Sequence, residues 1–531
     1  MQFVSDPPIP VKIGKMKERV RWQDRLITER GIDQTQLVLD SGFPDSPEFS
    51  FLVIGDSGSG AHGGYNPQRR IAEMMSKHRE DCRFVLHTGD VIYLVGSSEY
   101  YLQNFIQPYQ EFLVGGDRPK SITYDKMVFN LPFLPVPGNH DYYDLPLIYG
   151  ILAQAALPLR RLLNSKLDFD VGWHGSDQGN AYAKAFLDYL KALVWPSQLE
   201  SHLDRHYNAQ TATGRCLRYE PGRFTRLPNR YYTFRCGGID FFALDSNTFN
   251  TPLPLPATKA GDAYRQQLET RKQELEREKM QLLDSSTRLN RDRSEDLEQL
   301  DDVRTKIAQI DEQRLDIDKQ LTSSGEKSAT DWEQLDWLQK RLIESWHSSE
   351  VRGRVIYLHH PPYVTEATKW NQAQTLAIRH RLRLVLNQVA DTVAELAQGR
   401  SVVDLVLSGH AHCLEYLRTG DTGHADAHTP WLVCGGSGHS LRRQRPEGAL
   451  LMEVEEVRGD REMQPHRGSR PVATSKLFVG RNGQGSRKRR PYSGLRIDVF
   501  EGCPPKFQVK PLIAERFRGE WHHNYIEPFI I

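Results

Sequence analysis

Carboxylate, amide and imidazole side chains stand directly after a series of short apolar runs in this sequence. The residues in question are Asp56, Asp90, Asn139 with His140, His359, and His410 with His412. Hard divalent or trivalent metal ions at hydrolytic sites are bound by carboxylates, with imidazole nitrogens and amide oxygens completing the coordination. Two such ions about 3.5–4 Å apart need one carboxylate that bridges them. These residue types therefore predict a dinuclear metal site that performs hydrolysis.

The apolar runs that precede these residues predict β-strands buried inside a sheet. Runs of this length, with apolar residues on both faces, suit strands that are covered by helices. The seven runs occupy residues 49–56, 82–90, 131–141, 238–247, 354–363, 402–412 and 429–438. The intervening stretches 67–80 and 376–398 have helical character, so the alternation predicts an α/β or α+β layered domain. Because ligands gather at the carboxyl ends of strands in open α/β sheets, side chains far apart in sequence can converge there.

Five ordered blocks carry a resemblance to a known family. They are GDSG (55–58), GDVIY (89–93), GNHD (138–141), LHHPP (358–362) and GHAH (409–412). In type and order they resemble the blocks of the calcineurin-like metallophosphoesterase superfamily, over roughly residues 49–250 and 330–440. The resemblance implies that superfamily's β-sandwich flanked by helices, and hydrolysis of phosphate esters.

The first block departs from the pattern of many superfamily members. Those members carry Asp-x-His at this point, whereas Gly58 stands at the histidine position here. Together with Tyr93 in the second block, this departure resembles the purple acid phosphatase variant, in which the tyrosine is a metal ligand. The other interpretation of Tyr93 is a packed aromatic residue beside a site with only one strong carboxylate for its first metal.

Position by position, the resemblance implies two metal half-sites that share one carboxylate. The first metal ion would be bound by Asp56, Asp90, Tyr93 and His412. The second would be bound by Asp90, Asn139, His359 and His410, with Asp90 as the bridge. In the tyrosine variant the first ion is typically ferric iron, and the second is iron, zinc or manganese.

The remaining residues of these blocks are expected to act on the substrate. Two cations would lower the pKa of a bound water from about 16 towards 7, which makes hydroxide available near neutral pH. His140 would face the leaving group and, when protonated, donate to the departing alkoxide. Asp141 would orient His140 or a metal ligand. Asn139 and His140 would also contact the substrate, and His360 would either support a ligand or face the substrate.

The predicted activity is hydrolysis of phosphomonoesters by a hydroxide held between two metal ions. A phosphodiesterase or nucleotide hydrolase is the alternative on the same core, and in both cases the substrate is a phosphorylated small molecule or another phosphoester. A hypothesis from another class is a non-catalytic scaffold that presents a helical arm to a partner. Degenerate members of such families usually lose ligands, whereas all the expected ligands are present here.

The chain is predicted to fold as one interrupted core with additions. The first 48 residues are polar and irregular, and are interpreted as a peripheral N-terminal extension. The other parts are a first core segment at 49–250 with a helical insertion at about 142–228, a linker and arm at 251–329, a second core segment at 330–440, and C-terminal strands and loops at 441–531 that complete the core.

The arm lies in a highly charged segment, residues 262–322, that carries heptad signatures. Its first half has one leucine column at seven-residue intervals, and its second half has an apolar 3-4 repeat broken only by Arg314. Polar residues 290–296 separate the halves. We predict two long helices, preceded by a proline-rich linker, that form an antiparallel coiled-coil hairpin projecting from the body. The hairpin would be a structural arm, or an interface for a homodimer or a protein partner.

The overall charge of the chain is nearly balanced. Lys and Arg number 69 against 68 Asp and Glu, which gives a net charge of +1 and no electrostatic reason to expect nucleic acid or an anionic membrane. One local basic segment, 435–445, places His439 and three arginines after the last sheet strand, as a lid over an anionic substrate or as an ordinary loop. The six scattered cysteines suit free thiols. No signal-peptide stretch or membrane-spanning run is evident, so a cytoplasmic location is expected.

Overall fold

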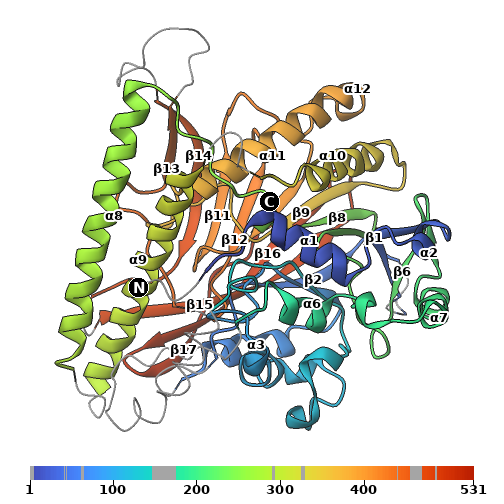
Figure 1. Cartoon of the computed structure of the whole chain (residues 1–531), viewed down its shortest axis with the longest axis horizontal. Coiled ribbons are helices and arrows are strands. Elements are labelled where there is room, and N and C mark those ends of the chain that lie inside the picture. The colour runs from blue at the N-terminus through green and yellow to red at the C-terminus, as the bar shows by residue number, and fades with distance from the viewer. Residues whose placement is uncertain are drawn as a thin grey trace.

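Two β-sheets face each other in the described part of the chain, and helices cover their outer surfaces (Figure 1). The computed structural model describes residues 5–40, 42, 45–60, 65–145, 175–289, 294–323, 329–438, 440–454, 469–484 and 487–531. In order across the larger sheet, the strands are β13 (Leu450–Val454), β14 (Ser469–Val479), β11 (Leu414–Thr419), β12 (Pro430–Cys434), β10 (Leu405–Ser408), β9 (Gly353–Leu358), β8 (Ile239–Leu244), β7 (Tyr232–Cys236), β1 (Ile32–Leu39), β6 (Gly214–Tyr219) and β5 (Ala209–Thr211).

The smaller sheet is built around the first two predicted strands. In order across it, the strands are β17 (Glu520–Asn524), β16 (Lys506–Phe517), β15 (Arg489–Phe500), β2 (Phe49–Ile54), β3 (Cys82–His87) and β4 (Phe133–Pro135), and β18 (Phe529–Ile530) also pairs with β16. Strands β2, β3 and β4 are parallel, and β15 adds to β2 in the antiparallel direction. The C-terminal strands therefore extend the sheet that the first segment begins.

The helices vary widely in length. The α-helices are α1 (Ile9–Arg19), α2 (Arg25–Thr28), α3 (Pro67–Lys77), α6 (Asn180–Phe186), α7 (Pro196–His206), α8 (Lys259–Ser286), α9 (Ser294–Thr322), α10 (Trp332–His347), α11 (Ala373–Thr392) and α12 (Ala394–Ala397). Short helical turns are η1 (Ser98–Tyr100), η2 (Leu102–Ile106), η3 (Gln110–Phe112), η4 (Pro119–Ser121), η5 (Tyr124–Lys126), η6 (Leu190–Ala192) and η7 (Ser246–Thr248). In the described part of the chain, no helix combines the length and apolar character needed to span a bilayer.

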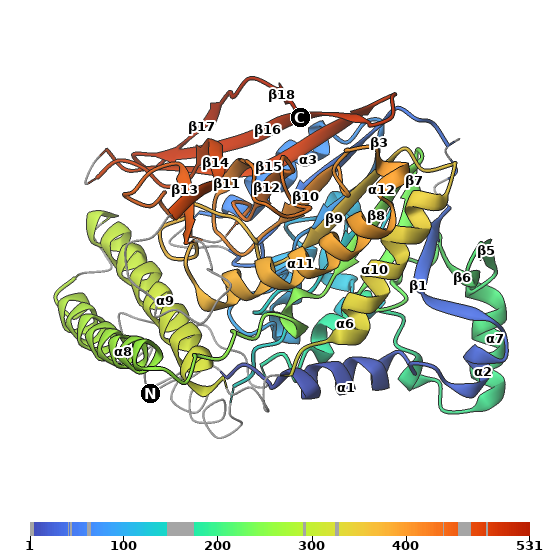
Figure 2. The ribbon, with the colours of Figure 1, turned by 90° about the horizontal axis from the view of Figure 1, so that it is seen from above.

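All seven apolar runs contain strands, as predicted. Strands β8, β9, β10 and β12 form the parallel centre of the larger sheet, and β2, β3 and β4 form that of the smaller one. Helices α10 and α11 cover the larger sheet, and α3 packs on β15 and β16 of the smaller sheet (Figure 2). The layered α/β fold of two sheets flanked by helices is therefore confirmed.

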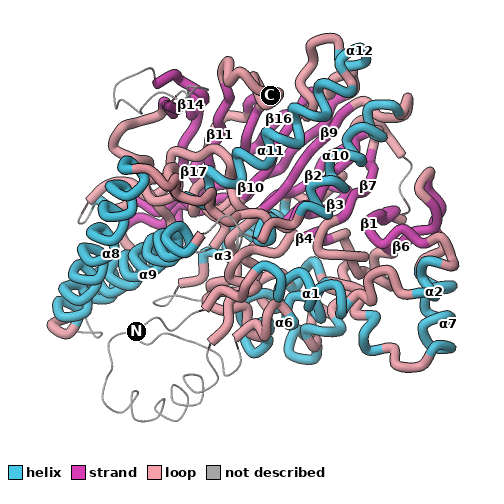
Figure 3. The backbone as a smooth tube through the Cα atoms, turned by 45° about the horizontal axis from the view of Figure 1, so that its top comes forward, coloured by secondary structure: helices cyan, strands magenta, loops and turns pink. Residues whose placement is uncertain are grey.

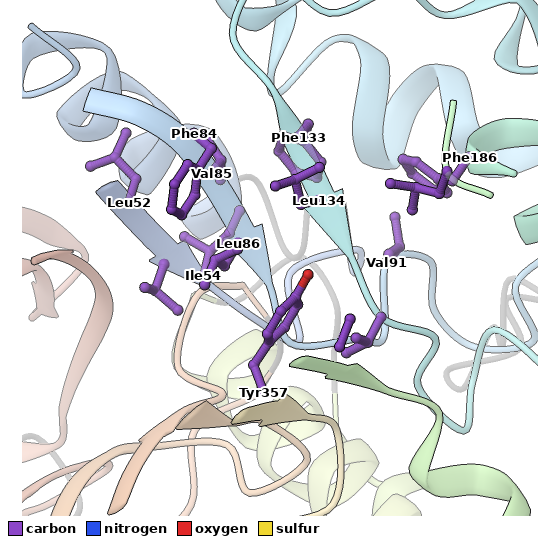
Figure 4. Packing of buried hydrophobic residues seen from close by; sticks show 14 of the residues in the cluster. Leu52, Ile54, Phe84, Val85, Leu86, Val91, Phe133, Leu134, Phe186 and Tyr357 are labelled. Atoms are coloured by element: carbon purple, nitrogen blue, oxygen red, sulfur yellow. The ribbon is translucent and has the colours of Figure 1, made fainter. Parts of the chain in front are cut away.

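Aromatic rings from the two sheets fill the space between them. The ring of Phe51 stacks on Phe84 at 5.2 Å, and Phe241 of the larger sheet meets Phe84 edge-on at 5.2 Å. Figure 4 shows Leu52 and Ile54 of β2 beside Val85 and Leu86 of β3, with Tyr357 of β9 reaching them from the other sheet. This apolar contact holds the sheets together, so the polar residues that follow the strands are brought to a common edge.

The N-terminal segment is not irregular, contrary to expectation. It forms α1, α2 and β1, and β1 pairs in parallel with β6 and β7 inside the larger sheet. Met16, Val20 and Leu37 are fully buried. The apolar residues here follow no clear period. The elements that pack on α1 and β1, namely α6, β6 and β7, come more than 150 residues later in the chain, so the local pattern did not predict this structure.

The insertion at about 142–228 is helical only in part. It contains α6 and α7, as predicted, but also the antiparallel pair β5 and β6, which extends the larger sheet. Residues 146–174 of this insertion lie outside the described residues.

The arm forms two antiparallel helices, α8 and α9, joined through a segment of which 290–293 lie outside the described residues. The apolar side chains that hold them together include Leu268 and Leu275 of α8 with Ile310 and Ile317 of α9. Ion pairs such as Lys279 with Asp311 border this seam. The expectation that the arm projects from the body is wrong, because α9 lies between α8 and the sheets (Figure 2). Interaction of residues 262–322 with a second copy or another protein stays a prediction.

Candidate metal centre

The residues singled out by the sequence follow strands of both sheets, whose arrangement is shown in Figure 3. Strands β2 and β3 lead into Asp56 and Asp90, and the loop after β4 carries Asn139. Strand β9 leads into His359, and β10 leads into His410 and His412. All of these side chains, together with Tyr93, are less than 5% exposed. The structure therefore brings residues from both core segments into one buried cluster.

The backbone turns sharply at three of these residues. Asp56, Asp90 and His410 have φ angles of 53°, 55° and 63°, in the left-handed region that residues with a side chain seldom adopt. Such strain costs about 1–3 kcal/mol per residue and persists where the surrounding structure enforces it, often at functional sites. A Cβ atom at Gly138 would lie only 2.1 Å from Asp90 Oδ1, so glycine there lets the two loops approach closely.

The first group of side chains surrounds the phenol of Tyr93. Its hydroxyl oxygen lies 3.0 Å from Asp56 Oδ1, 2.7 Å from Asp90 Oδ2 and 3.1 Å from His412 Nε2. Tyr93 is therefore part of the cluster rather than beside it. Its ring is also 4.3 Å from the ring of His140, measured between centroids.

The second group surrounds the imidazole of His359. Its Nε2 lies 2.8 Å from Asn139 Oδ1, 3.2 Å from His410 Nδ1 and 3.4 Å from Asp90 Oδ2. The same oxygen of Asp90 thus faces both groups. The other oxygen, Oδ1, is occupied because it accepts a hydrogen bond of 2.9 Å from the backbone N–H of His140.

Backbone carbonyls set the orientation of two of these imidazoles. His359 Nδ1 lies 2.8 Å from the carbonyl oxygen of Thr88, and His412 Nδ1 lies 3.1 Å from that of Ser440. A carbonyl oxygen only accepts, so each Nδ1 carries a proton, and Nε2 is the ring nitrogen turned towards the cluster. Imidazole nitrogen, amide oxygen and carboxylate oxygen then lie close together. This donor set fits a pair of hard or borderline metal cations.

The electrostatics of the buried carboxylates also favour positive charge. Burial raises the pKa of Asp56 well above its usual range. Burial acts in the same direction on Asp90, but His359 and His140 outweigh it and hold the pKa of Asp90 well below its usual range. Burial lowers the pKa of His359, yet Asp90 and Asp56 overcome it and raise that pKa to about 9. Asp90 is therefore the ionised carboxylate of the cluster, and it attracts cationic partners.

His140 reaches the cluster from the GNHD loop. Its Nδ1 lies 2.5 Å from the carbonyl oxygen of Leu94, which fixes the ring. Its Nε2 lies 4.0 Å from Asp90 Oδ2 and 4.0 Å from Glu312 Oε1. His140 is thus held with its Nε2 turned towards the cluster.

Asp141 and His360 form hydrogen bonds with residues around the cluster. Asp141 accepts from the backbone N–H groups of Val91 at 3.1 Å and Gly138 at 2.8 Å, so it ties two of the motif loops together. His360 Nδ1 lies 2.8 Å from Ser246 Oγ, and its ring centroid is 4.5 Å from that of His410. Both residues are placed to position their neighbours.

Three charged residues at the cluster were not predicted as site residues. Lys369 Nζ lies 3.0 Å from His410 Nε2, and Glu312 of α9 pairs with Lys369. Glu312 occupies an ordinary polar position of the heptad pattern, and Lys369 lies in a segment without periodicity, so neither gave a signal. Arg442 belongs to the basic segment 435–445, for which the sequence left open a lid or an ordinary loop. Arg443 of that segment instead reaches the carbonyl of Gly483, and His439 lies outside the described residues.

Comparison with known proteins identifies similarity in both sequence and structure. The family model for calcineurin-like phosphoesterase matches residues 49–196. A solved structure of GAP50, "the anchor in the inner membrane complex of Plasmodium", is 11% identical, covers 90% of this chain and 89% of that one, and has a TM-score of 0.37. A purple acid phosphatase from yellow lupin (Lupinus luteus) seeds is 12% identical, with 92% and 54% coverage and a TM-score of 0.40. PhoD is 11% identical, with 92% and 70% coverage and a TM-score of 0.38. No curated protein matches.

Proposed function

We propose that this chain, whose residues 49–196 match the calcineurin-like phosphoesterase model, hydrolyses phosphomonoesters at a dinuclear centre of the purple acid phosphatase type. One observation carries the proposal: a single oxygen of Asp90 faces both the Tyr93 hydroxyl, at 2.7 Å, and His359 Nε2, at 3.4 Å. A bridging carboxylate between two metal ions requires this kind of shared position.

The proposed ligands form two half-sites. The first consists of Asp56, Asp90, Tyr93 and His412, and the second of Asp90, Asn139, His359 and His410. Iron is proposed for the first half-site, and iron, zinc or manganese for the second. When bound, the two cations supply Lewis acidity that lowers the pKa of water and neutralises charge on the phosphoryl oxygens.

The protein residues have separate tasks in this proposal. His140 donates a proton from Nε2 to the leaving oxygen, while Leu94 holds Nδ1 and so fixes the ring. Asp141 positions the loops that carry Asp90 and Asn139. For His360 the geometry favours a positioning role, because its Nδ1 is engaged by Ser246 and its ring lies against His410.

The test compares two substrates on protein of known metal content. Purified protein is analysed for metals and assayed with p-nitrophenyl phosphate and with bis-p-nitrophenyl phosphate. We expect two metal ions per chain and a higher kcat/KM for the monoester. A preference for the diester would replace the monoester proposal by the phosphodiesterase alternative. Two bound metals without turnover of either substrate would contradict phosphoester hydrolysis and favour the scaffold hypothesis.

A further inference from the structure

Helix α9 docks on the body over the candidate centre, through residues that recur on one face of the helix. Thr305 Oγ1 lies 2.5 Å from Ser440 Oγ, and Asp316 accepts from the backbone N–H of Ala373 at 2.9 Å, at the start of α11. Lys319 pairs with Asp6 of the N-terminal segment at 2.7 Å. The apolar seam of α9 is turned to α8, and its polar contacts with the body are accompanied by Leu315, which packs on the apolar cluster of Val95, Tyr143 and Leu145.

Glu312 lies in the middle of this polar face and enters the cluster. Its Oε2 lies 2.8 Å from Lys369 Nζ and 3.9 Å from Arg442 Nη2, and its Oε1 lies 4.0 Å from His140 Nε2. A lysine, an arginine and a histidine therefore surround one carboxylate at the edge of the proposed metal centre. Because Glu312 is only 13% exposed, no small anion can share this place without displacing it.

Arg442 has hydrogen-bonding capacity that its described neighbours leave unused. Its backbone N–H donates to the carbonyl of His412 at 2.9 Å, and its Nη1 donates to the carbonyl of Thr305 at 3.0 Å. Its Nε and Nη2 are buried and make no hydrogen bond with any residue that the structure describes, and its side chain is fully buried. A buried donor without an acceptor is costly, and Nε with Nη2 forms the fork that binds phosphate in a bidentate manner.

Lys369 is also placed to change partner. Its ammonium donates to His410 Nε2, which must therefore be the unprotonated nitrogen of that ring. The same ammonium lies 2.8 Å from Glu312 Oε2. An anion that displaced Glu312 would therefore meet the charge of Lys369 as well as that of Arg442.

We propose that Lys369 and Arg442 bind the phosphate of the substrate, and that Glu312 occupies their binding position until α9 moves away. This inference rests on the proposed phosphoesterase function. The ligand residues are buried in the closed arrangement, so access requires movement of a covering element. When α9 moves away, its polar contacts with the body can be replaced by water and by phosphate, the apolar contact of Leu315 is lost, and the apolar seam with α8 is retained. The two helices therefore move together.

The experiment measures binding of inorganic phosphate by isothermal titration calorimetry to the full chain with its metals. Glu312→Gln keeps the shape of the side chain and removes its charge, so it should bind phosphate about tenfold or more tightly than the parent. Lys369→Gln and Arg442→Gln should each bind about tenfold or more weakly, with unchanged metal content. Asp311→Asn is the matched control, because Asp311 is adjacent on α9 but pairs with Lys279 of α8, and its phosphate affinity should equal that of the parent.

Hydrogen exchange measured by mass spectrometry tests the movement directly. Phosphate should accelerate exchange of the backbone amides of residues 303–319 in the parent, and Glu312→Gln should show faster exchange there without phosphate. The proposal is overturned if phosphate affinity is the same in parent and Glu312→Gln, if Lys369→Gln and Arg442→Gln keep full affinity, or if phosphate binds while exchange in α9 is unchanged.

The calorimetric result is separable from the hydrolytic one. If phosphate binding responds to these variants but p-nitrophenyl phosphate is not hydrolysed, the hydrolytic function fails and the anion site stands. If hydrolysis proceeds but Glu312→Gln, Lys369→Gln and Arg442→Gln change neither the phosphate affinity nor the KM, the anion site fails and the hydrolytic function stands.

Discussion

Replacement of Asp90 by asparagine tests the shared ligand, because the structure dictates how the new amide must lie. Oδ1 of Asp90 accepts the backbone N–H of His140 at 2.9 Å, so the amide oxygen of the substituted side chain has to take this position. The NH2 group then points at the place of Oδ2, towards Tyr93 and His359. An NH2 group donates and has no lone pair for a metal ion, so Asp90→Asn removes one ligand from both half-sites at once.

The expected loss of metal affinity can be judged from substitutions of residues that support a metal ligand, which have a smaller effect. Loss of a residue that merely supports a ligand costs about 10–100-fold in metal affinity. Loss of the charged ligand itself should reach at least the upper end for each ion, which is about 2.7 kcal/mol per ion. The fold should survive, because the NH2 group can donate to the Tyr93 oxygen and to His359 Nε2, which lie 2.7 Å and 3.4 Å from Oδ2.

The assay is elemental analysis after dialysis, together with thermal unfolding with and without added metal. The parent should hold two ions and melt at a higher temperature when metal is added. Asp90→Asn should hold fewer than one ion and show no metal-dependent shift. Asp404→Asn is the control, since Asp404 is a partly buried carboxyl before β10 that accepts the backbone N–H of Arg354 at 2.7 Å, at the opposite end of that strand from His410. Two ions retained by Asp90→Asn would refute the bridging role.

Three further predictions concern catalysis, metal identity and pH. His140→Ala should keep the metal content of the parent and lose about 10²–10⁴-fold in turnover, as expected for loss of a general acid; a variant that loses metal but not turnover per bound metal would disprove that role. In iron-loaded protein, Tyr93→Phe should abolish a tyrosinate–iron absorption band in the visible spectrum, and absence of the band from the iron-loaded parent would count against Tyr93 as a ligand. Burial raises the pKa of the Glu415 carboxyl from 4.5 to about 7. Between pH 4.5 and pH 7 this carboxyl is therefore ionised in the unfolded chain but protonated in the folded chain, so the free energy of unfolding falls as the pH rises. Glu415→Gln removes this loss of stability, which is about 3 kcal/mol. The difference in melting temperature between the variant and the parent should therefore grow from pH 4 to pH 8, and a difference that does not change with pH would contradict the explanation.

The sequence predicted a helix or strand correctly where the element's own apolar residues are the reason that it is buried. The runs ending at Asp56, Asp90, His359 and His410 are apolar on both faces, and a strand with such residues can only be stable between other layers. The seam of α8 and α9 was equally readable, since Leu275 and Ile310 belong to repeats that match one helix to another. In contrast, the apolar residues of β1, Ile32 and Leu37 to Leu39, do not alternate with polar ones, and the strand owes its place in the sheet to β6 and β7.

The amino-acid sequence by itself determined the strands, the residue types at their ends and the pairing of two long helices. The strands and the helix pair follow from apolar patterns within short stretches of the chain, and the residue types at the strand ends are given by the sequence directly. Only the tertiary structure decided that α9 lies over the centre, that Glu312 meets Lys369 and Arg442, and that Lys319 meets Asp6. Contacts between charges leave no period in a sequence, because each needs only one residue of either sign and its partner can stand anywhere in the chain.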